Sequence, residues 1–348
     1  MADPARPSVT LTDVAAHAGV SLATASRALN GSARTVKPEL RDRVAASARA
    51  LGYVVNAQAQ AVAKGASRTV ALVLGDIADP YFAGIAAGVI AAAGRRELAV
   101  TMATTGSDAA GERSAVAALQ AQRPQAIVLA GSRHVDRSEE DLLDRELAEF
   151  QSRGGRVAFV GEGARADDAA ARVVSVRNRQ GARELALAVA GLGYRDFAVL
   201  AGSPLLLTPQ ERVAGFLEGA ASAGHPVAPE AVLSGPFSRD GGYEVMGRLL
   251  ASGRRPECVF AVTDVMAVGA MAAIRDHGLR PGADVAVAGF DDIPMLKDVH
   301  PELTTVALPL AEIGERALEL TFSDEPPAYA PITGRVMLRP STPAVGDS

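Results

Sequence analysis

Residues 10–30 carry two short apolar stripes at helical spacing on either side of Gly19, which restricts this segment to two helices joined by a tight turn. Gly19 can take the left-handed conformation that such a turn needs, and Ser21 directly after it offers an N-cap oxygen for the second helix. Small alanines on both stripes allow a close, steep crossing, so the pattern predicts a helix-turn-helix. The stripes are Leu11, Val14, Ala15 and Ala18, then Ala25, Ala28 and Leu29.

Capping signals fix the start of the first helix and add a third helix to the unit. Thr10 and Asp13 have the spacing of a capping box. Pro38 suits the first turn of a helix, and Gly52 suits its end. The inner stripe of this third helix is Leu40, Val44, Ala48 and Leu51.

The outer face of the second helix has the chemistry of a DNA-reading surface. Arg27 can donate two hydrogen bonds to guanine, and Leu22 and Ala23 can meet thymine methyl groups. Ser21 and Thr24, at the helix start, suit phosphate contacts. A three-helix protein-interaction module is the alternative. The candidate DNA-binding residues in this unit are Thr10, Ser21, Leu22, Ala23, Thr24, Arg27 and Asn30.

Charge is distributed unevenly between this unit and the rest of the chain. Residues 1–67 hold eight Lys and Arg against four Asp and Glu, whereas residues 68–348 hold 27 against 36. A small basic unit on an acidic body is typical of a protein that contacts nucleic acid through the small unit alone. A solvated basic face would give the same counts.

From Arg68 onward, short apolar runs alternate with stretches of helical spacing, which predicts parallel sheets covered by helices and an α/β fold. The aromatic content of 4% and the absence of tryptophan agree with closely packed helices and sheets. The length of 348 residues favours a small module plus a larger body. The expected strands are 70–74, 126–129, 157–160, 197–200, 258–262 and 285–288.

Several functional classes find no support in the sequence. The single cysteine, Cys258, cannot form an internal disulfide, and it builds no metal site with five scattered histidines, so we expect no metal or cofactor. No phosphate loop or nucleophile elbow occurs, and Asp291 and Asp292 are explained by loop solvation, so we expect no catalysis. We also expect a cytoplasmic protein with no membrane contact, since no signal pattern or membrane-spanning run is present.

Residues 9–21 and 24–31 resemble the start of the lactose-repressor/galactose-repressor family of bacterial transcription regulators. The resemblance extends over nearly the whole chain, which makes it far more specific than one short motif. Its further segments are Gly52-Tyr53, Asn56, Asp79-Pro80-Tyr81-Phe82, Gly289-Phe290-Asp291-Asp292 and Leu303-Thr304-Thr305.

The resemblance implies a helix-turn-helix domain (1–55), a hinge helix and linker (56–67) and a two-lobed, periplasmic-binding-protein-like body (68–348) with parallel sheets. The expected lobes are 68–170 with 304–332, and 171–303 with 333–343. It also implies a homodimer, repression at a pseudo-palindromic double-stranded operator, and control by a small effector held between the lobes. Whether the effector releases DNA or promotes binding stays open, and a periplasmic-type solute-binding or sensor protein is the alternative.

In the family, the hinge helix forms on DNA and inserts an apolar wedge into the minor groove. Asn56 and Val62 are the corresponding hinge residues here, with Val62 in place of a leucine. A shorter wedge unstacks a base step less effectively. A plain linker is the alternative reading.

The effector site implied by the resemblance combines aromatic rings with groups that hydrogen-bond hydroxyls. Phe82 and Phe237 would pack on the ligand, and the polar contacts would come from Arg212, Asp264 and Asp291. The alternatives are helix caps or inter-lobe contacts for the two aspartates and ordinary core for Phe237. Two departures from the family pattern, Arg177 and Gly161-Glu162, leave a sugar phosphate or sugar acid open beside a neutral sugar.

Overall fold

The computed structural model describes residues 9–30, 36–54, 67–106, 109–161, 172–323 and 329–346. The chain divides into two compact units, residues 1–67 and 68–348, which we describe separately. Asn56 and Val62 lie outside the described residues, as does Glu162.

The first unit is a helix-turn-helix followed by a third helix, as the sequence predicted: α1 (Leu11–Ala18), α2 (Leu22–Asn30) and α3 (Pro38–Leu51). Thr10 and Asp13 form the expected capping box, and Gly19 turns the chain with φ of 61°. The alanine stripes face inward, because a miniature core of this size needs side chains that let three helices approach closely. Its buried members are Val14, Ala15, Ala18, Ala25, Ala28, Val44 and Ala48.

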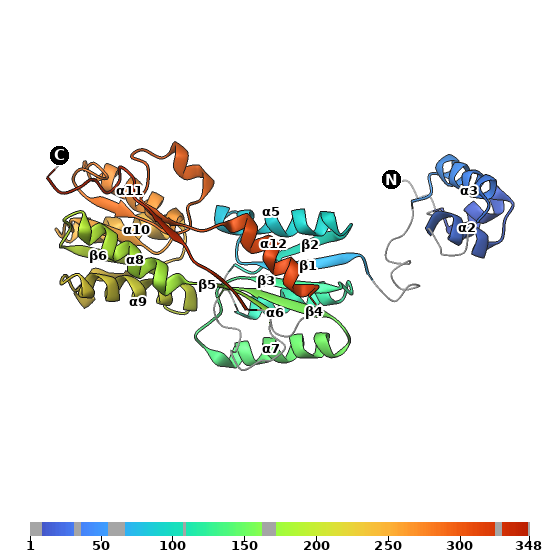
Figure 1. The fold of residues 1–348 in the computed structure, drawn as a ribbon, viewed down its shortest axis with the longest axis horizontal. Helices are drawn as coiled ribbons and strands as arrows, with labels where there is room; N and C mark the ends of the chain where they lie inside the picture. Colours follow the sequence, from blue (N-terminus) through green and yellow to red (C-terminus); the bar gives the residue numbers. More distant parts are fainter. Residues whose placement is uncertain are drawn as a thin grey trace, which may run out of the picture. The chain divides into compact units, whose positions relative to one another are not determined.

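The second unit begins with a six-stranded parallel sheet in the order β11-β5-β4-β3-β1-β2. Its strands are β1 (Thr69–Leu74), β2 (Ala99–Thr104), β3 (Ala126–Ala130), β4 (Arg156–Val160), β5 (Arg172–Val176) and β11 (Tyr329–Ile332). Helices cover both faces (Figure 1), which explains why the central strands are apolar throughout. They are α5 (Pro80–Arg95), α6 (Ala109–Gln120), α7 (Arg137–Ser152) and α12 (Leu310–Thr321).

Alternation along β1 divides the core of this lobe into two layers. Val70, Leu72 and Leu74 join the cluster that includes α5 and α12, whereas Ala71 and Val73 join a separate cluster with α6 and α7. Successive side chains of a strand point to opposite faces, so one apolar run serves both layers.

The second lobe has a four-stranded parallel sheet in the order β7-β6-β8-β9. The strands are β6 (Phe197–Gly202), β7 (Val232–Ser234), β8 (Cys258–Ala261) and β9 (Ala286–Ala288). Cys258 is buried in this sheet. The helices are α8 (Asn178–Gly191), α9 (Leu207–Ser222), α10 (Arg239–Ala251) and α11 (Asp264–Asp276), with short 3-10 turns at Pro229–Ala231 and Pro294–Asp298.

The chain crosses between the lobes after β5, β10 (Thr305–Ala307) and β11, and β10 pairs antiparallel with β12 (Arg335–Met337). The first crossing, expected near 171, falls instead after Val176, because β5 pairs with both β4 and β11 in the first sheet. The second, expected near 303, follows β10, since Thr304 and Ala307 form bridges with Ala288 and Asp291 of the second lobe.

Glycines on α5 make its contact with α12 testable. A Cβ on Gly88 would lie 1.9 Å from the Ala311 carbonyl oxygen of α12, whereas one on Gly94 would meet nothing within 4 Å. Gly88→Ala should therefore lower the free energy of unfolding by about 1–3 kcal/mol through overpacking. Gly94→Ala, the control on the same helix, should raise it by about 0.5 kcal/mol because glycine is a poor helix former. Urea denaturation measures both changes, and equal values for the two variants would contradict the packing argument.

Candidate functional site

The exposed start of α2 presents the predicted DNA-reading residues. Ser21 accepts a hydrogen bond from the Thr24 N–H at 3.2 Å and so caps the helix. Leu22 is 50% exposed, a large fraction for a leucine, and Ala23 beside it is also exposed. The Arg27 Nε donates to the Ala23 carbonyl at 2.9 Å, which directs the guanidinium along the helix start and leaves Nη1 and Nη2 for other acceptors.

Thr10 is exposed and engaged in the capping box: its N–H donates to Asp13 Oδ2 at 2.8 Å, and its hydroxyl donates to the same oxygen at 2.7 Å. The side chain of Asn30 lies outside the described residues.

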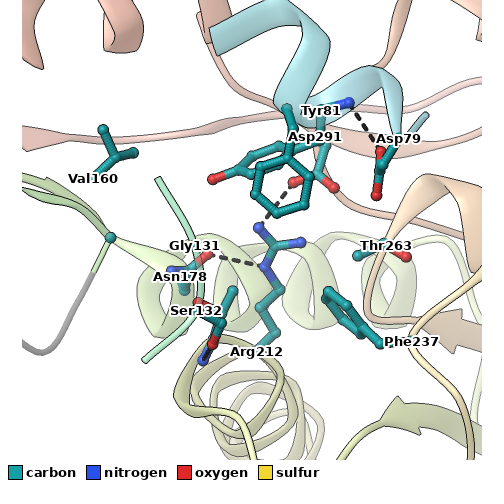
Figure 2. Close-up of a pocket in the computed structure, with 13 residues that line it drawn as sticks. Asp79, Tyr81, Gly131, Ser132, Val160, Asn178, Arg212, Phe237, Thr263 and Asp291 are labelled. Atoms are coloured by element: carbon teal, nitrogen blue, oxygen red, sulfur yellow. Dashed lines mark hydrogen bonds and ion pairs between the residues drawn. The ribbon is translucent and has the colours of Figure 1, made fainter. Parts of the chain in front are cut away.

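A pocket of about 430 Å³, part of it open to solvent, lies where the carboxyl ends of strands from both lobes face each other. Figure 2 shows Arg212 in its centre, extending toward Asp291, with Tyr81 and Asp79 beyond and Phe237 and Thr263 to one side. The lining residues are Asp79, Tyr81, Phe82, Gly131, Ser132, Val160, Gly161, Asn178, Thr208, Arg212, Phe237, Thr263 and Asp291.

Arg212 is only 1% exposed, and residues of the second lobe hold its guanidinium at the pocket wall. Nε donates to Asn178 Oδ1 at 2.9 Å, and Nη1 donates to the Val262 carbonyl at 2.8 Å. Nη2 forms an ion pair with Asp291 Oδ1 at 2.8 Å, and the group lies 4.0 Å from the centre of the Phe290 ring. A charge this deeply buried persists because each of these contacts compensates its lost hydration.

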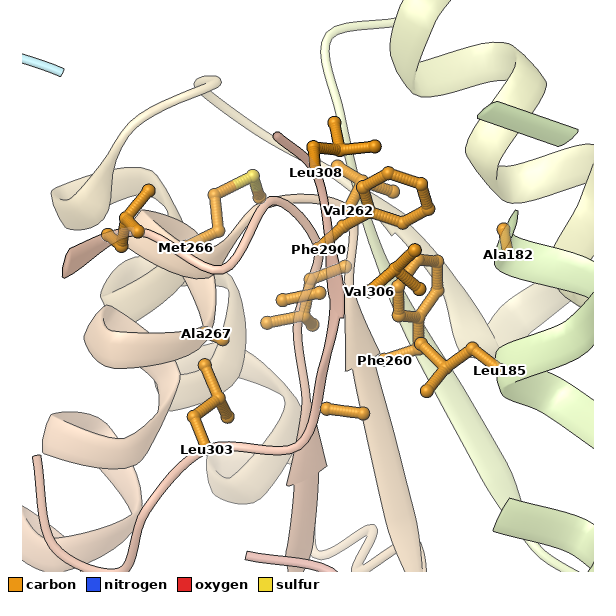
Figure 3. Close-up of a cluster of buried hydrophobic side chains, with 14 of the residues drawn as sticks. Ala182, Leu185, Phe260, Val262, Met266, Ala267, Phe290, Leu303, Val306 and Leu308 are labelled. Carbon is orange, nitrogen blue, oxygen red and sulfur yellow. The ribbon is translucent and has the colours of Figure 1, made fainter. Parts of the chain in front are cut away.

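The Phe290 ring is fixed in turn by the core of the second lobe. Figure 3 shows Phe260, Phe290 and Val306 gathered against Leu185 and Ala182 of α8. The platform under Arg212 is therefore part of the hydrophobic core.

Asp291 is held in an unusual backbone conformation, with φ of 121°. Its N–H donates to the Val306 carbonyl at 2.9 Å, and its own carbonyl accepts from the Leu308 N–H at 3.2 Å, so the inter-lobe segment keeps it in place. Burial raises the pKa of Asp291, and the Arg212 guanidinium opposes this shift.

Asp264 does not line the pocket, although the sequence placed it among the effector contacts. It is fully buried, and its carboxylate accepts from the Ile293 N–H at 3.0 Å and from the Thr305 hydroxyl at 2.6 Å. Burial raises its pKa to about 6. Asp264 therefore joins α11 to the crossing strand β10, and Thr263, not Asp264, caps the helix and faces the pocket.

The two aromatic residues expected to pack on the ligand lie at the pocket, and their contact with a ligand stays a prediction. Phe82 and Phe237 both line the pocket, Phe82 buried and Phe237 half-buried against the core. Glycines make room for both rings: a Cβ on Gly75 or Gly202 would lie 2.7 Å from Phe82 or Phe237.

Sequence reasoning missed several polar lining residues. Asp79 caps α5 through the Tyr81 N–H at 2.9 Å, and burial raises its pKa. Ser132 follows β3, and its position at the end of a parallel strand was the available signal, whereas Thr208 lies in the first turn of α9 after β6. Arg177, which suggested an anionic ligand, is exposed and does not line the pocket, whereas its neighbour Asn178 does.

Comparison with known proteins agrees with both units. Residues 10–56 match the family described as bacterial regulatory proteins, lacI family, and residues 186–342 match the periplasmic binding protein-like domain. The HTH-type transcriptional regulator GalS of Salmonella typhimurium strain LT2 is 33% identical over 314 residues, which cover 90% of this chain and 89% of GalS. CelR of Thermobifida fusca is 32% identical over 316 residues, covering 89% of this chain and 90% of CelR.

Comparison with solved structures also finds matches that extend over nearly the whole chain. A complex of CelR with cellobiose has a TM-score of 0.70 at 29% identity and covers 97% of this chain and 100% of that one. The lac repressor dimer bound to operator and the anti-inducer ONPF has a TM-score of 0.81 with the same coverage, and at 24% identity it supports the fold alone.

A helix-turn-helix unit followed by a two-lobed binding body defines a ligand-responsive transcription regulator. The chain belongs to the lacI family of bacterial regulatory proteins. The alternative of a solute-binding protein without a role in transcription is not supported, because the first unit matches the family as well. Among the described residues no helix is long and apolar enough to cross a membrane.

Proposed function

We propose that this regulator binds a pseudo-palindromic operator as a homodimer and that an uncharged sugar in the inter-lobe pocket controls its affinity for DNA. The observation that carries the proposal is the combination of Phe82 and Phe237 with Asp79, Ser132 and Thr208 around one cavity. Aromatic faces cover the apolar side of a sugar ring, while carboxylates and hydroxyls bind its hydroxyl groups.

The charges around the pocket favour an uncharged ligand over an anionic one. The lining includes two carboxylates, Asp79 and Asp291, against one guanidinium. Arg212 is already paired with Asp291 and hydrogen-bonded to Asn178. A phosphate or carboxylate would have to compete for that guanidinium and would also face Asp79, and like charges in a buried site are costly.

A thermal-shift panel tests the ligand class. D-galactose, D-ribose and cellobiose represent neutral sugars, and glucose 6-phosphate and gluconate represent anionic ones. A ligand at 100 times its Kd stabilises the native state by about 2.7 kcal/mol, so a neutral binder should raise Tm by several degrees.

Asp79→Asn should weaken that stabilisation, because an amide replaces a carboxylate acceptor. Asp76→Asn is the matched control, since Asp76 is exposed on the same loop and does not line the pocket. Stabilisation by the anionic sugars alone would contradict the proposal, and so would a neutral-sugar shift that Asp79→Asn leaves unchanged.

A further inference from the structure

Two loops from different lobes pair with each other beside the pocket, at a place where the chain does not cross. We call residues 132–135, after β3, and 205–208, at the start of α9, the strap. The Val135 N–H donates to the Leu205 carbonyl at 2.9 Å. One position along, His134 and Leu206 face each other as an antiparallel bridge. The strap is thus a short ladder of main-chain hydrogen bonds between the lobes.

The strap also reaches into the pocket wall. The Leu207 N–H donates to the Arg133 carbonyl at 2.9 Å, and the Thr208 N–H donates to Ser132 Oγ at 2.9 Å. Ser132 and Thr208 both line the pocket. Because the strap and the pocket share these two residues, a change in the pairing of the lobes moves part of the ligand site.

A buried charge cluster under the strap fixes its first-lobe half. Arg133 is 8% exposed, forms ion pairs with Glu140 and with Asp144 (2.7 Å for the latter), and lies 5.3 Å from the centre of the Phe159 ring. Glu140 also accepts from the His134 N–H at 2.7 Å. Arg133 and Glu140 therefore act as positioning residues that hold the backbone of 133–134 toward the second lobe.

We propose that the strap holds the two lobes closed against each other and thereby sets the affinity of the pocket for its ligand. The first part of the proposal concerns this chain alone; the second rests on the proposed function. The strap joins the lobes at a point separate from the crossing segments, so its pairing restricts the relative rotation of the lobes about those segments.

Leu207→Pro removes one rung of the strap with little local strain. Leu207 is the first residue of α9, where proline is well tolerated, and Leu206 before it has φ of −112° and ψ of 139°, which suits a residue preceding proline. Leu207→Ala is the matched control, because it shortens the same side chain but keeps the N–H donor. Ser132→Ala and Ser132→Thr form a second pair that respectively lacks and keeps the acceptor hydroxyl for Thr208.

Spin labels on Glu149→Cys of α7 and Ser222→Cys of α9, both exposed, report the distance between the lobes in the full chain. Mixing labelled protein with an excess of unlabelled protein keeps distances between subunits out of the measurement. We expect one narrow distance distribution for the parent and for Leu207→Ala, and a broadened one for Leu207→Pro. Ser132→Ala should broaden the distribution too, and Ser132→Thr should restore it.

Identical distributions in Leu207→Pro and the parent would overturn the proposal that the strap holds the lobes closed. If Leu207→Pro does not fold, the comparison of Ser132→Ala with Ser132→Thr decides in the same way.

The second measurement is the affinity for the neutral sugar that stabilises the parent in the thermal-shift panel. Leu207→Pro should bind this sugar roughly threefold to tenfold more weakly, because a loss of that size corresponds to one net hydrogen bond. Unchanged affinity would overturn the link between strap and pocket. Absence of any sugar binding by the parent would count against the proposed ligand class, and the distance measurement would still decide whether the strap closes the lobes.

Discussion

Replacing Arg212 by methionine is expected to lower the free energy of unfolding by about 3–5 kcal/mol, because the change leaves a buried carboxylate without its partner. Asp291 is 2% exposed, and its ion pair with Arg212 is the charge compensation that opposes its burial. Methionine has a similar length and fills much of the space over the Phe290 ring, so the loss reports charge more than volume. Urea denaturation of the full chain measures the change.

Two further variants separate the effect of the buried charge on stability from the other effects of replacing an arginine. Arg212→Met combined with Asp291→Asn should recover about half of the loss or more, since removing both charges avoids the unpaired carboxylate. Asparagine is isosteric with aspartate, so it is the substitution that least disturbs the strained backbone at this position, where φ is 121°. Arg179→Met, which breaks an exposed ion pair with Glu218, should cost about 0–1 kcal/mol. A double variant no more stable than the single one would mean that Arg212 stabilises the lobe through its other contacts, which include the hydrogen bonds to Asn178 and Val262, and not through its ion pair with Asp291.

Arg27→Ala is expected to weaken operator binding by about 1–3 kcal/mol and to relax the preference at one base pair. In the structure, the hydrogen bond from Nε to the Ala23 carbonyl leaves Nη1 and Nη2 free to approach the edge of a guanine together. Arg27→Lys should recover affinity only in part, because an ammonium cannot match two acceptors in a plane. Selection of binding sites from a random duplex library, followed by titration, measures both quantities.

The control is Arg49→Ala at the end of α3, an exposed cation outside the reading helix. It should change affinity less than Arg27→Ala and leave the base preference intact, since a nonspecific charge acts through phosphates. If both variants weaken binding equally and neither relaxes the preference, Arg27 does not read a base.

Local sequence patterns predicted the helices and strands well where the hydrophobic periodicity and the capping residues indicated the same element. The Thr10 capping box, the Gly19 turn and the Pro38 start all appear as expected, and the six predicted apolar runs correspond to β1, β3, β4, β6, β8 and β9. Strand β2 was missed because it lies at the edge of its sheet with exposed and half-buried residues. Strands β5, β7, β10, β11 and β12 were missed as well, and β5 was missed although four of its five residues are buried. Short or half-exposed strands carry little apolar signal.

The candidate site residues also divide into those that local sequence patterns placed and those that depended on contacts between distant segments. Phe82, Arg212 and Asp291 could be placed because each follows a recognisable strand or motif, whereas Phe237 came from the family resemblance alone; all four line the pocket. Asp264 could not, since its direction depends on the Thr305 hydroxyl and the Ile293 N–H, which come from segments 41 and 29 residues away in the chain.

The sequence by itself determined the helix-turn-helix, the α/β body and the strand ends at which a ligand site forms, because each depends on periodicity, caps and chirality within short segments. Tertiary structure decided which polar side chains are already satisfied within the protein. Arg212 is buried in contacts with its own lobe, Asp264 is turned away from the pocket, and Ser132 meets Thr208 across the lobes. These outcomes depend on long-range packing and on the cost of burying unpaired polar groups, which no short sequence pattern contains.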